Sequence, residues 1–170
     1  MTPMLVRAER PDDYAAVHQL NRDAFQADGE ADLVDALRTA ASPIISLVAE
    51  DDGDVVGHIL FSPVTLAPHD GLRVAGLGPM AVSPARQRSG IGSRLVRAGL
   101  EACREGGFAA AVVVGHPDFY PRFGFRSASQ FGIACEFDVP DPVFMALELI
   151  AGTLRDRSGT IYYHPAFKAL

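Results

Sequence analysis

The chain of 170 residues contains no tryptophan and a single lysine, Lys168. Its formal net charge is −6, and no basic stretch is longer than Arg86-Gln87-Arg88. Because nucleic-acid binding normally needs a surplus of lysine and arginine to neutralise phosphates, this charge balance argues against a nucleic-acid partner. The scarcity of lysine also leaves mechanisms that use a catalytic lysine with one candidate, close to the end of the sequence.

The chain has only two cysteines, Cys103 and Cys135, and they lie far apart. Neither belongs to a Cys-x-x-Cys pair or a Cys/His cluster, which a structural metal site would require. We therefore expect no metal site and two reduced, mostly buried thiols. Cys103 falls on the apolar side of a predicted helix, in keeping with this expectation.

No apolar run approaches the ~20 residues that span a bilayer, so no membrane partner is expected. Residues 1–13 become charged early and lack the apolar core of a signal peptide, which favours a cytoplasmic protein. Apolar residues make up 48% and charged residues 21%, as in globular domains. Without repeats or linkers, the chain is expected to form one domain over 1–170, with a core over about 4–150 and a C-terminal strand and tail over 151–170.

Hydrophobic periodicity predicts an α/β fold with a mixed, mostly antiparallel sheet. The first helix opens at Pro11, and we expect Tyr14, Val17, Leu20 and Phe25 on its buried face. Strands are predicted over 4–8, 44–50, 55–65, 73–82, 108–114, 133–137, 143–150 and 160–163, with helices over 11–25, 30–39 and 90–105 and a short one over 117–123.

The strand over 73–82, the helix over 90–105 and the strand over 108–114 form a predicted βαβ crossover. Such a connection places its two strands parallel to each other. Gly76 and Gly78-Pro79 lie inside the first of these strands, although glycine and proline weaken a regular ladder. We therefore expect a β-bulge there.

The crossover strand passes to its helix through Arg88 to Ser93. The start of a helix has unpaired backbone N–H groups and partial positive charge. Gly90 and Gly92 would let an anion approach these N–H groups closely, so the loop predicts an anion site. Taken alone, the same glycines are equally typical of a tight strand-to-helix turn.

Two nucleotide-binding fingerprints fail at this loop. The dinucleotide motif needs a third glycine, where this chain has Leu95, and an acidic residue after the next strand, where it has Gly115-His116. The P-loop needs Gly-Lys-Ser/Thr, whereas Gly92 is followed by Ser93-Arg94.

The pattern that fits is Gln/Arg-x-x-Gly-x-Gly/Ala at Gln87–Gly92, with Gly78–Val82 before it and Tyr120–Phe125 after it. In these motifs the chain resembles the GNAT family of N-acetyltransferases. Through Gly57–Pro63 and Phe144–Leu149 the likeness is closest to poorly characterised bacterial predicted acetyltransferases. The resemblance implies a bulged fourth strand splayed from the fifth, with helices on both faces of the sheet.

The resemblance also implies acetyl-CoA as co-substrate. The pantetheine arm would pair with the backbone of Met80 and Val82, and an N–H group near Met80 or Ala81 would stabilise an oxyanion. The pyrophosphate would be bound by main-chain amides of Gln87, Arg88, Ser89, Gly90, Ile91, Gly92 and Ser93.

Tyr120 occupies the position that the resemblance implies for the general acid, although it also suits packing beside Phe119 and Phe123. Glu30, His58 and His116 are the candidate bases. Two of them have an ordinary structural alternative: a helix N-terminal acid for Glu30 and a hydrogen-bonded strand residue for His58. A chain of water molecules is a further alternative to all three.

The function implied is transfer of an acetyl group from acetyl-CoA to a primary amine, by direct attack through a tetrahedral intermediate. A non-catalytic acyl-CoA sensor or partner module with the same fold is the alternative. The acceptor, a small molecule or a protein amine, and the acyl chain length stay open, as does a homodimer. We expect the aromatic group Phe119, Phe123, Phe125 and Phe131 to belong to the core and not to the acceptor pocket.

Overall fold

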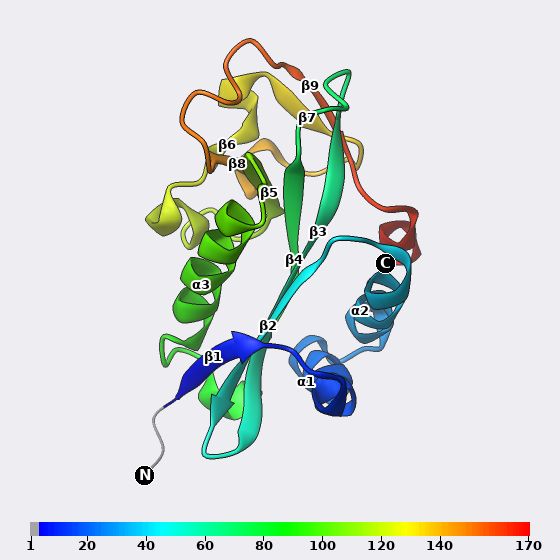
Figure 1. The fold of residues 1–170 in the computed structure, drawn as a ribbon, viewed down its shortest axis with the longest axis vertical. Coiled ribbons are helices and arrows are strands. Elements are labelled where there is room, and N and C mark those ends of the chain that lie inside the picture. The colour runs from blue at the N-terminus through cyan, green and yellow to red at the C-terminus, as the bar shows by residue number, and fades with distance from the viewer. Residues whose placement is uncertain (1–3) are drawn as a thin grey trace.

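The computed structural model describes residues 4–170, and Figure 1 shows its ribbon. The strands are β1 (Leu5–Ala8), β2 (Ile45–Asp51), β3 (Asp54–Ala67), β4 (Val74–Val82), β5 (Ala110–Val114), β6 (Arg126–Ser127), β7 (Ile133–Cys135), β8 (Phe144–Glu148) and β9 (Gly159–Tyr162). The α-helices are α1 (Tyr14–Phe25), α2 (Gly29–Ala40) and α3 (Ile91–Glu105). Short 3-10 turns cover Pro11–Asp13, Pro84–Arg86, Tyr120–Phe123, Ala128–Phe131, Asp141–Val143 and Pro165–Ala169.

The main sheet has the strand order β1-β2-β3-β4-β5-β8-β6. Only β4 and β5 run parallel in it, with Val74 opposite Ala110 and Leu77 opposite Val113. The predicted mixed, mostly antiparallel sheet and the βαβ crossover are both confirmed. β6 was not predicted, because two residues are too few to show a period.

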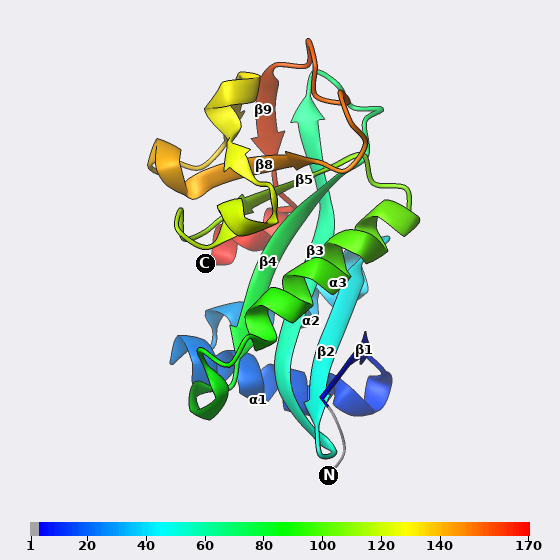
Figure 2. The ribbon, with the colours of Figure 1, turned by 90° about the vertical axis from the view of Figure 1, so that its left-hand side faces the viewer.

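Helices cover both faces of the sheet (Figure 2), as the sequence predicted. On one face, α3 buries Ile91, Leu95 and Cys103 against the strands. Alternate residues of β2 and β3 point the other way, and Val48 and Leu60 pack there against α1 and α2. The alternation follows from the pleat of a strand, which turns successive side chains to opposite faces.

The C-terminal part of the chain returns along the molecule. β9 pairs with the end of β3, Leu66 opposite Ile161, and β7 pairs with β9. The segment Pro165–Ala169 then lies beside α2 (Figure 1), and a Leu170 methyl group comes within 3.3 Å of the point where a Cβ on Gly29 would lie. These pairings bring the end of the sequence to the middle of the molecule.

The predicted bulge in β4 is present. Ile59 pairs with Met80 and Phe61 with Leu77, so β4 has one more residue than β3 over this stretch. Gly78, at the bulge, has a φ of +148°, a conformation that L side chains rarely adopt. Pairing with β5 ends at Leu77, and no described strand pairs with the β5 side of Met80–Val82.

The expected burial of Tyr14 and Phe25 is wrong, and Phe25, the last residue of α1, is 39% exposed. Tyr14 is 38% exposed, and the guanidinium group of Arg38 lies over its ring at 3.8 Å. It stands at the first turn of α1, outside the contact that Val17 and Leu20 make with the core. Cys103 is buried as expected, whereas Cys135 is only half-buried, and both thiols are free. Within residues 4–170 no helix is long and apolar enough to cross a membrane.

The contact between α3 and β3 yields a test of the packing. A Cβ on Gly99 would lie 2.3 Å from Cε2 of Phe61, which is fully buried. Gly99→Ala should therefore lower the free energy of unfolding by about 1–3 kcal/mol through overpacking, although alanine alone favours a helix by about 1 kcal/mol. Urea unfolding would measure the change.

Gly71→Ala is the matched control, because it lies in an exposed turn with no atom within 4 Å of the added Cβ. Its unfolding free energy should change by less than about 0.5 kcal/mol. A Gly99→Ala variant as stable as the parent would contradict the close α3–β3 contact.

Candidate active site

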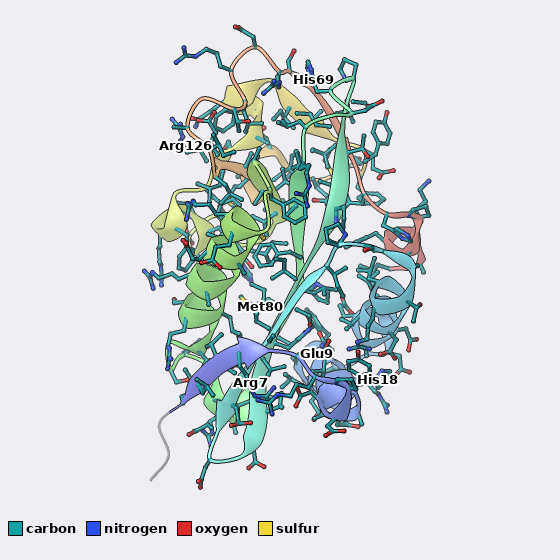
Figure 3. The ribbon with its side chains drawn as sticks, viewed as in Figure 1. Arg7, Glu9, His18, His69, Met80 and Arg126 are labelled. Carbon is teal, nitrogen blue, oxygen red and sulfur yellow. The ribbon has the colours of Figure 1, made fainter. Side chains whose placement is uncertain are left out.

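A cavity of about 910 Å³ opens where β4 and β5 separate. Met80, labelled near the centre of Figure 3, lies on its wall. The remaining lining comes from α1, α2, β4, β5, the segment that follows β5, and the segments around β7 and β9: Phe25, Glu30, Leu33, Leu77, Gly78, Pro79, Val113, Val114, Gly115, His116, Tyr120, Glu136, Phe137, Val139, Tyr163, Phe167, Lys168 and Leu170. The splayed strands thus form one side of the cavity, and the C-terminal part of the chain forms the other.

The backbone of β4 presents free groups toward this opening. The Ser83 N–H group donates to the Val56 carbonyl at 2.8 Å, which fixes the phase of the β3–β4 ladder. Because hydrogen bonding alternates along an antiparallel pair, Ala81 also faces β3, while Met80 and Val82 point to the opposite edge. In agreement, the Val82 carbonyl accepts a hydrogen bond from Gln87 Nε2 at 3.3 Å, outside the sheet.

The loop before α3 has the backbone that the anion hypothesis requires. Gly90 caps the helix with a φ of +85°, and no atom lies within 4 Å of the point where a Cβ would stand. Arg88 also has a positive φ, +65°, and both residues are exposed. The N–H groups of the first helical turn have no partner within a helix, so they face an open approach.

The two arginine side chains of the loop differ in whether they already have a partner. Arg86 forms an ion pair with Asp51 of the β2–β3 hairpin, so its charge is already compensated. Ser89 Oγ donates to the Arg86 carbonyl, which closes the loop on itself. Arg88 makes no hydrogen bond or ion pair with any residue in 4–170, which leaves it available to an anion.

Tyr120 lies on the cavity wall and is 7% exposed. Its ring packs edge-on against Phe119 and Phe125, with centroid distances of 5.0 and 5.7 Å. Burial raises the pKa of its hydroxyl to about 12, so the group is protonated at neutral pH.

Gly115 is a residue that the sequence did not single out. A Cβ at this position would lie 2.3 Å from Cε2 of Tyr120, so the ring occupies space that only glycine leaves free. The glycine follows β5 directly, and its N–H group donates to the Val143 carbonyl at 2.9 Å. The position of Tyr120 therefore depends on Gly115.

The three candidate bases do not lie together. Glu30 and His116 both line the cavity. His58 is fully buried away from it, where its Nε2 lies 2.9 Å from Ser46 Oγ and its Nδ1 3.4 Å from Asn21 Nδ2. Desolvation, with a smaller effect of Arg38, lowers the pKa of His58 to about 3. The imidazole is therefore neutral and lies away from the candidate site.

The aromatic side chains of the cavity differ from the group that the sequence singled out. Phe119, Phe123, Phe125 and Phe131 pack in the hydrophobic clusters and do not line the cavity, as expected. Phe25, Phe137, Tyr163 and Phe167 line it instead. Sequence reasoning missed the last three, because only the pairing of β7, β9 and β3 brings them there.

One group of side chains in residues 4–170 has the spacing of metal ligands. His18, Asp32 and Asp35 have ligand atoms within 4.8 Å of one another, on the α1–α2 side of the molecule (Figure 3). His18 Nδ1 already pairs with Asp35 at 2.8 Å, and Arg38 binds the same carboxylate at 2.9 Å. These residues are outside the cavity lining, and we assign no metal to them.

Residues 6–128 match the family model described as an acetyltransferase (GNAT) domain. The chain belongs to the GNAT family of acetyltransferases. The family assignment made from the three sequence motifs is thereby confirmed.

Two bacterial relatives cover nearly all of this GNAT chain. YhbS of Escherichia coli K12, named an uncharacterized N-acetyltransferase, is 36% identical over 165 residues, or 96% of this chain and 98% of YhbS. The crystal structure of E. coli YhbS in complex with CoA matches with a TM-score of 0.91, at 34% identity over 99% of this chain and 95% of that one. A GNAT acetyltransferase from Brucella melitensis, in complex with acetyl-CoA, matches with a TM-score of 0.81, at 38% identity over 97% and 98% of the two chains.

The contact between Gly115 and Tyr120 predicts an energetic coupling in this GNAT protein. Gly115→Ala should lower the free energy of unfolding by about 1–3 kcal/mol, because the Tyr120 ring is packed and cannot easily yield. In a Tyr120→Ala background, the added methyl group would have no ring to clash with. The same substitution should then lower the free energy of unfolding by less than about 0.5 kcal/mol. A double-mutant cycle of urea unfolding measures the coupling, and equal costs in both backgrounds would contradict the contact.

Proposed function

We propose that this protein is an N-acetyltransferase that moves the acetyl group of acetyl-CoA to a primary amine. The observation that carries the proposal is the unpaired edge of β4 at Met80 and Val82. It runs from the open amides of α3 to a cavity that holds Tyr120. The CoA and acetyl-CoA complexes of the two bacterial relatives support the choice of donor.

In the proposed complex the donor would lie along these residues from end to end. The pyrophosphate would lie on the amides of Gly90–Ser93, with Arg88 adding charge and Gln87 ordering the loop through the Val82 carbonyl. The pantetheine arm would continue β4 as an added strand along Met80 and Val82. Ala81, whose backbone groups face β3, does not line the cavity and would make none of these hydrogen bonds.

The reaction then needs few groups. The amine nitrogen attacks the thioester carbonyl carbon, and the oxygen of the tetrahedral intermediate accepts a hydrogen bond from the Met80 N–H group. The intermediate collapses with cleavage of the C–S bond, the sulfur leaves with the electron pair and takes up one proton, and the nitrogen loses one. Water or a side-chain base accepts the proton from the nitrogen, and of the three candidate bases Glu30 and His116 line the cavity.

Tyr120 is the group we assign to the departing sulfur. Its pKa of about 12 exceeds the value of about 8.5 for an ordinary thiol, so complete proton transfer to the thiolate is uphill. The hydroxyl therefore acts first as a hydrogen-bond donor to the developing thiolate.

The proposal further includes one N-acetyltransferase domain over 1–170, a cytoplasmic location and a homodimer. Each of these is a prediction from the sequence.

Thiol release tests the proposal directly. With acetyl-CoA and a panel of primary amines, at least one acceptor should release free CoA, detected with a thiol reagent, and yield the acetamide. Acetyl-CoA binding without thiol release for any amine would indicate the non-catalytic sensor. Failure to bind acetyl-CoA at millimolar concentration would overturn both functions.

Two substitutions separate catalysis from donor binding. Tyr120→Phe should lower kcat at least tenfold with little change in the Kd of acetyl-CoA, because only the hydroxyl is lost. Gly90→Val should raise that Kd at least tenfold, since its side chain would stand in the phosphate approach. Gly152→Val is the control for Gly90→Val, because Gly152 has a similar φ of +79° and equally open surroundings outside the site. Unchanged kcat in Tyr120→Phe would remove Tyr120 from the mechanism.

A further inference from the structure

The C-terminal side of the cavity, which we call its acceptor end, has a wall of aromatic rings tilted against one another. The Tyr163 ring lies between those of Phe137 and Phe167, with centroid distances of 5.6 and 5.0 Å. It rests on β4, because a Cβ on Gly76 would lie 3.2 Å from its Cε1. Phe25 of α1 adds a fourth ring to the lining and is 39% exposed. Such a surface suits a flat apolar body more than a chain of polar groups.

Two carboxylates line the same cavity. Glu136 is half-buried, and its Oε2 accepts a hydrogen bond from the Tyr163 N–H group at 2.6 Å, while Oε1 has no partner in the described chain. Glu30, on the first turn of α2, also lines the cavity, and its carboxylate has no hydrogen-bond or ion-pair partner among residues 4–170. Because Glu136 is held against the aromatic wall by one oxygen, its other oxygen is the better-positioned acceptor for an ammonium group.

The balance of charge restricts the acceptor further. Lys168 is the only lysine of the chain, no arginine is among the lining residues described, and the Lys168 side chain is exposed. Two carboxylates against one ammonium favour a ligand of net positive charge and disfavour an added carboxylate. A polyamine or aminosugar would bring several charges and hydroxyl groups to a wall that offers mainly rings.

We infer that the acceptor is an arylalkylamine, a primary amine on a short chain that ends in an aromatic group. Its ring lies against Phe137, Tyr163 and Phe167, and its ammonium group meets Glu136 before deprotonation. This inference rests on the proposed function, since it names the substrate class of the same cavity. Glu136 is therefore a substrate-binding residue. By binding the ammonium group it places the attacking nitrogen near Met80 and Tyr120.

Competition among acceptors tests the inference. 2-Phenylethylamine should be acetylated with kcat/KM at least tenfold above that of butylamine, which has the same charge and no ring. Its kcat/KM should also exceed that of spermidine, which adds positive charges, and that of phenylalanine, which adds a carboxylate. Equal use of butylamine, or preference for spermidine or phenylalanine, would overturn the arylalkylamine assignment while leaving an N-acetyltransferase.

Two pairs of variants locate the binding. Phe167→Ala should remove most of the preference over butylamine, whereas Tyr162→Ala should keep it, because Tyr162 is 48% exposed and does not line the cavity. Glu136→Gln keeps an acceptor for the Tyr163 N–H group but loses the charge. It should raise KM for 2-phenylethylamine about tenfold with kcat little changed, and Asp138→Asn, an exposed neighbour outside the lining, should not.

Calorimetry separates failure of this inference from failure of the proposed function. 2-Phenylethylamine should bind to the CoA-saturated protein, more weakly in Glu136→Gln and in Phe167→Ala. If it binds in this way without any acetyl transfer, the pocket assignment stands and the enzymatic function fails. If it does not bind, or binds equally to all four variants, the assignment is wrong whatever amine is acetylated.

Discussion

The separation of β4 from β5 after Leu77 is the constraint on which the rest of the site depends. Two strands that pair along their whole length leave no backbone free, and a parallel pair in a sheet covered by helices is normally continuous. Here one extra residue at Gly78-Pro79 interrupts the β3–β4 register, and pairing with β5 stops at the same place. The interruption opens the cavity. It also leaves the backbone groups of Met80 and Val82 that point away from β3 without a strand partner.

Such an opening carries an energetic cost, because buried backbone groups without partners destabilise a fold. The protein limits that cost locally: the Gln87 side chain binds the Val82 carbonyl, and the cavity keeps the edge accessible. A ligand with amide groups at a matching spacing would form hydrogen bonds with the backbone groups of Met80 and Val82 that are still free. The helix α3 begins immediately beyond this edge, so one continuous path links free strand amides to free helix amides.

Much of this site could be predicted from the sequence, because its signals are local. Gly78-Pro79 inside a strand pattern predicts a bulge, and Gly90 before a periodic helix predicts the open helix start. The βαβ crossover follows from the apolar strand over 108–114. Local signals gave no access to Gly115, whose role is a contact with a ring five residues later, or to Tyr14, whose helical phase suggested burial.

The acceptor end lay beyond sequence reasoning for a different physical reason. Glu136, Tyr163 and Phe167 reach the cavity only because β9 pairs with β3 and β7 with β9, and short strands of three or four residues carry no register information of their own. His58 shows the converse. A strand histidine can point to either face, and only the pleat and the packing of Asn21 and Ser46 direct it into the core.

Amide hydrogen exchange, measured with and without saturating acetyl-CoA, tests whether the donor binds along the free edge of β4. Bound donor should slow exchange of the Met80 and Val82 amides, and of those at the start of α3, at least tenfold. The Ala81 amide, directed to β3, should exchange slowly in both states. If acetyl-CoA binds without protecting the Met80 and Val82 amides, the donor does not lie along the free edge of β4, and the assigned site is wrong.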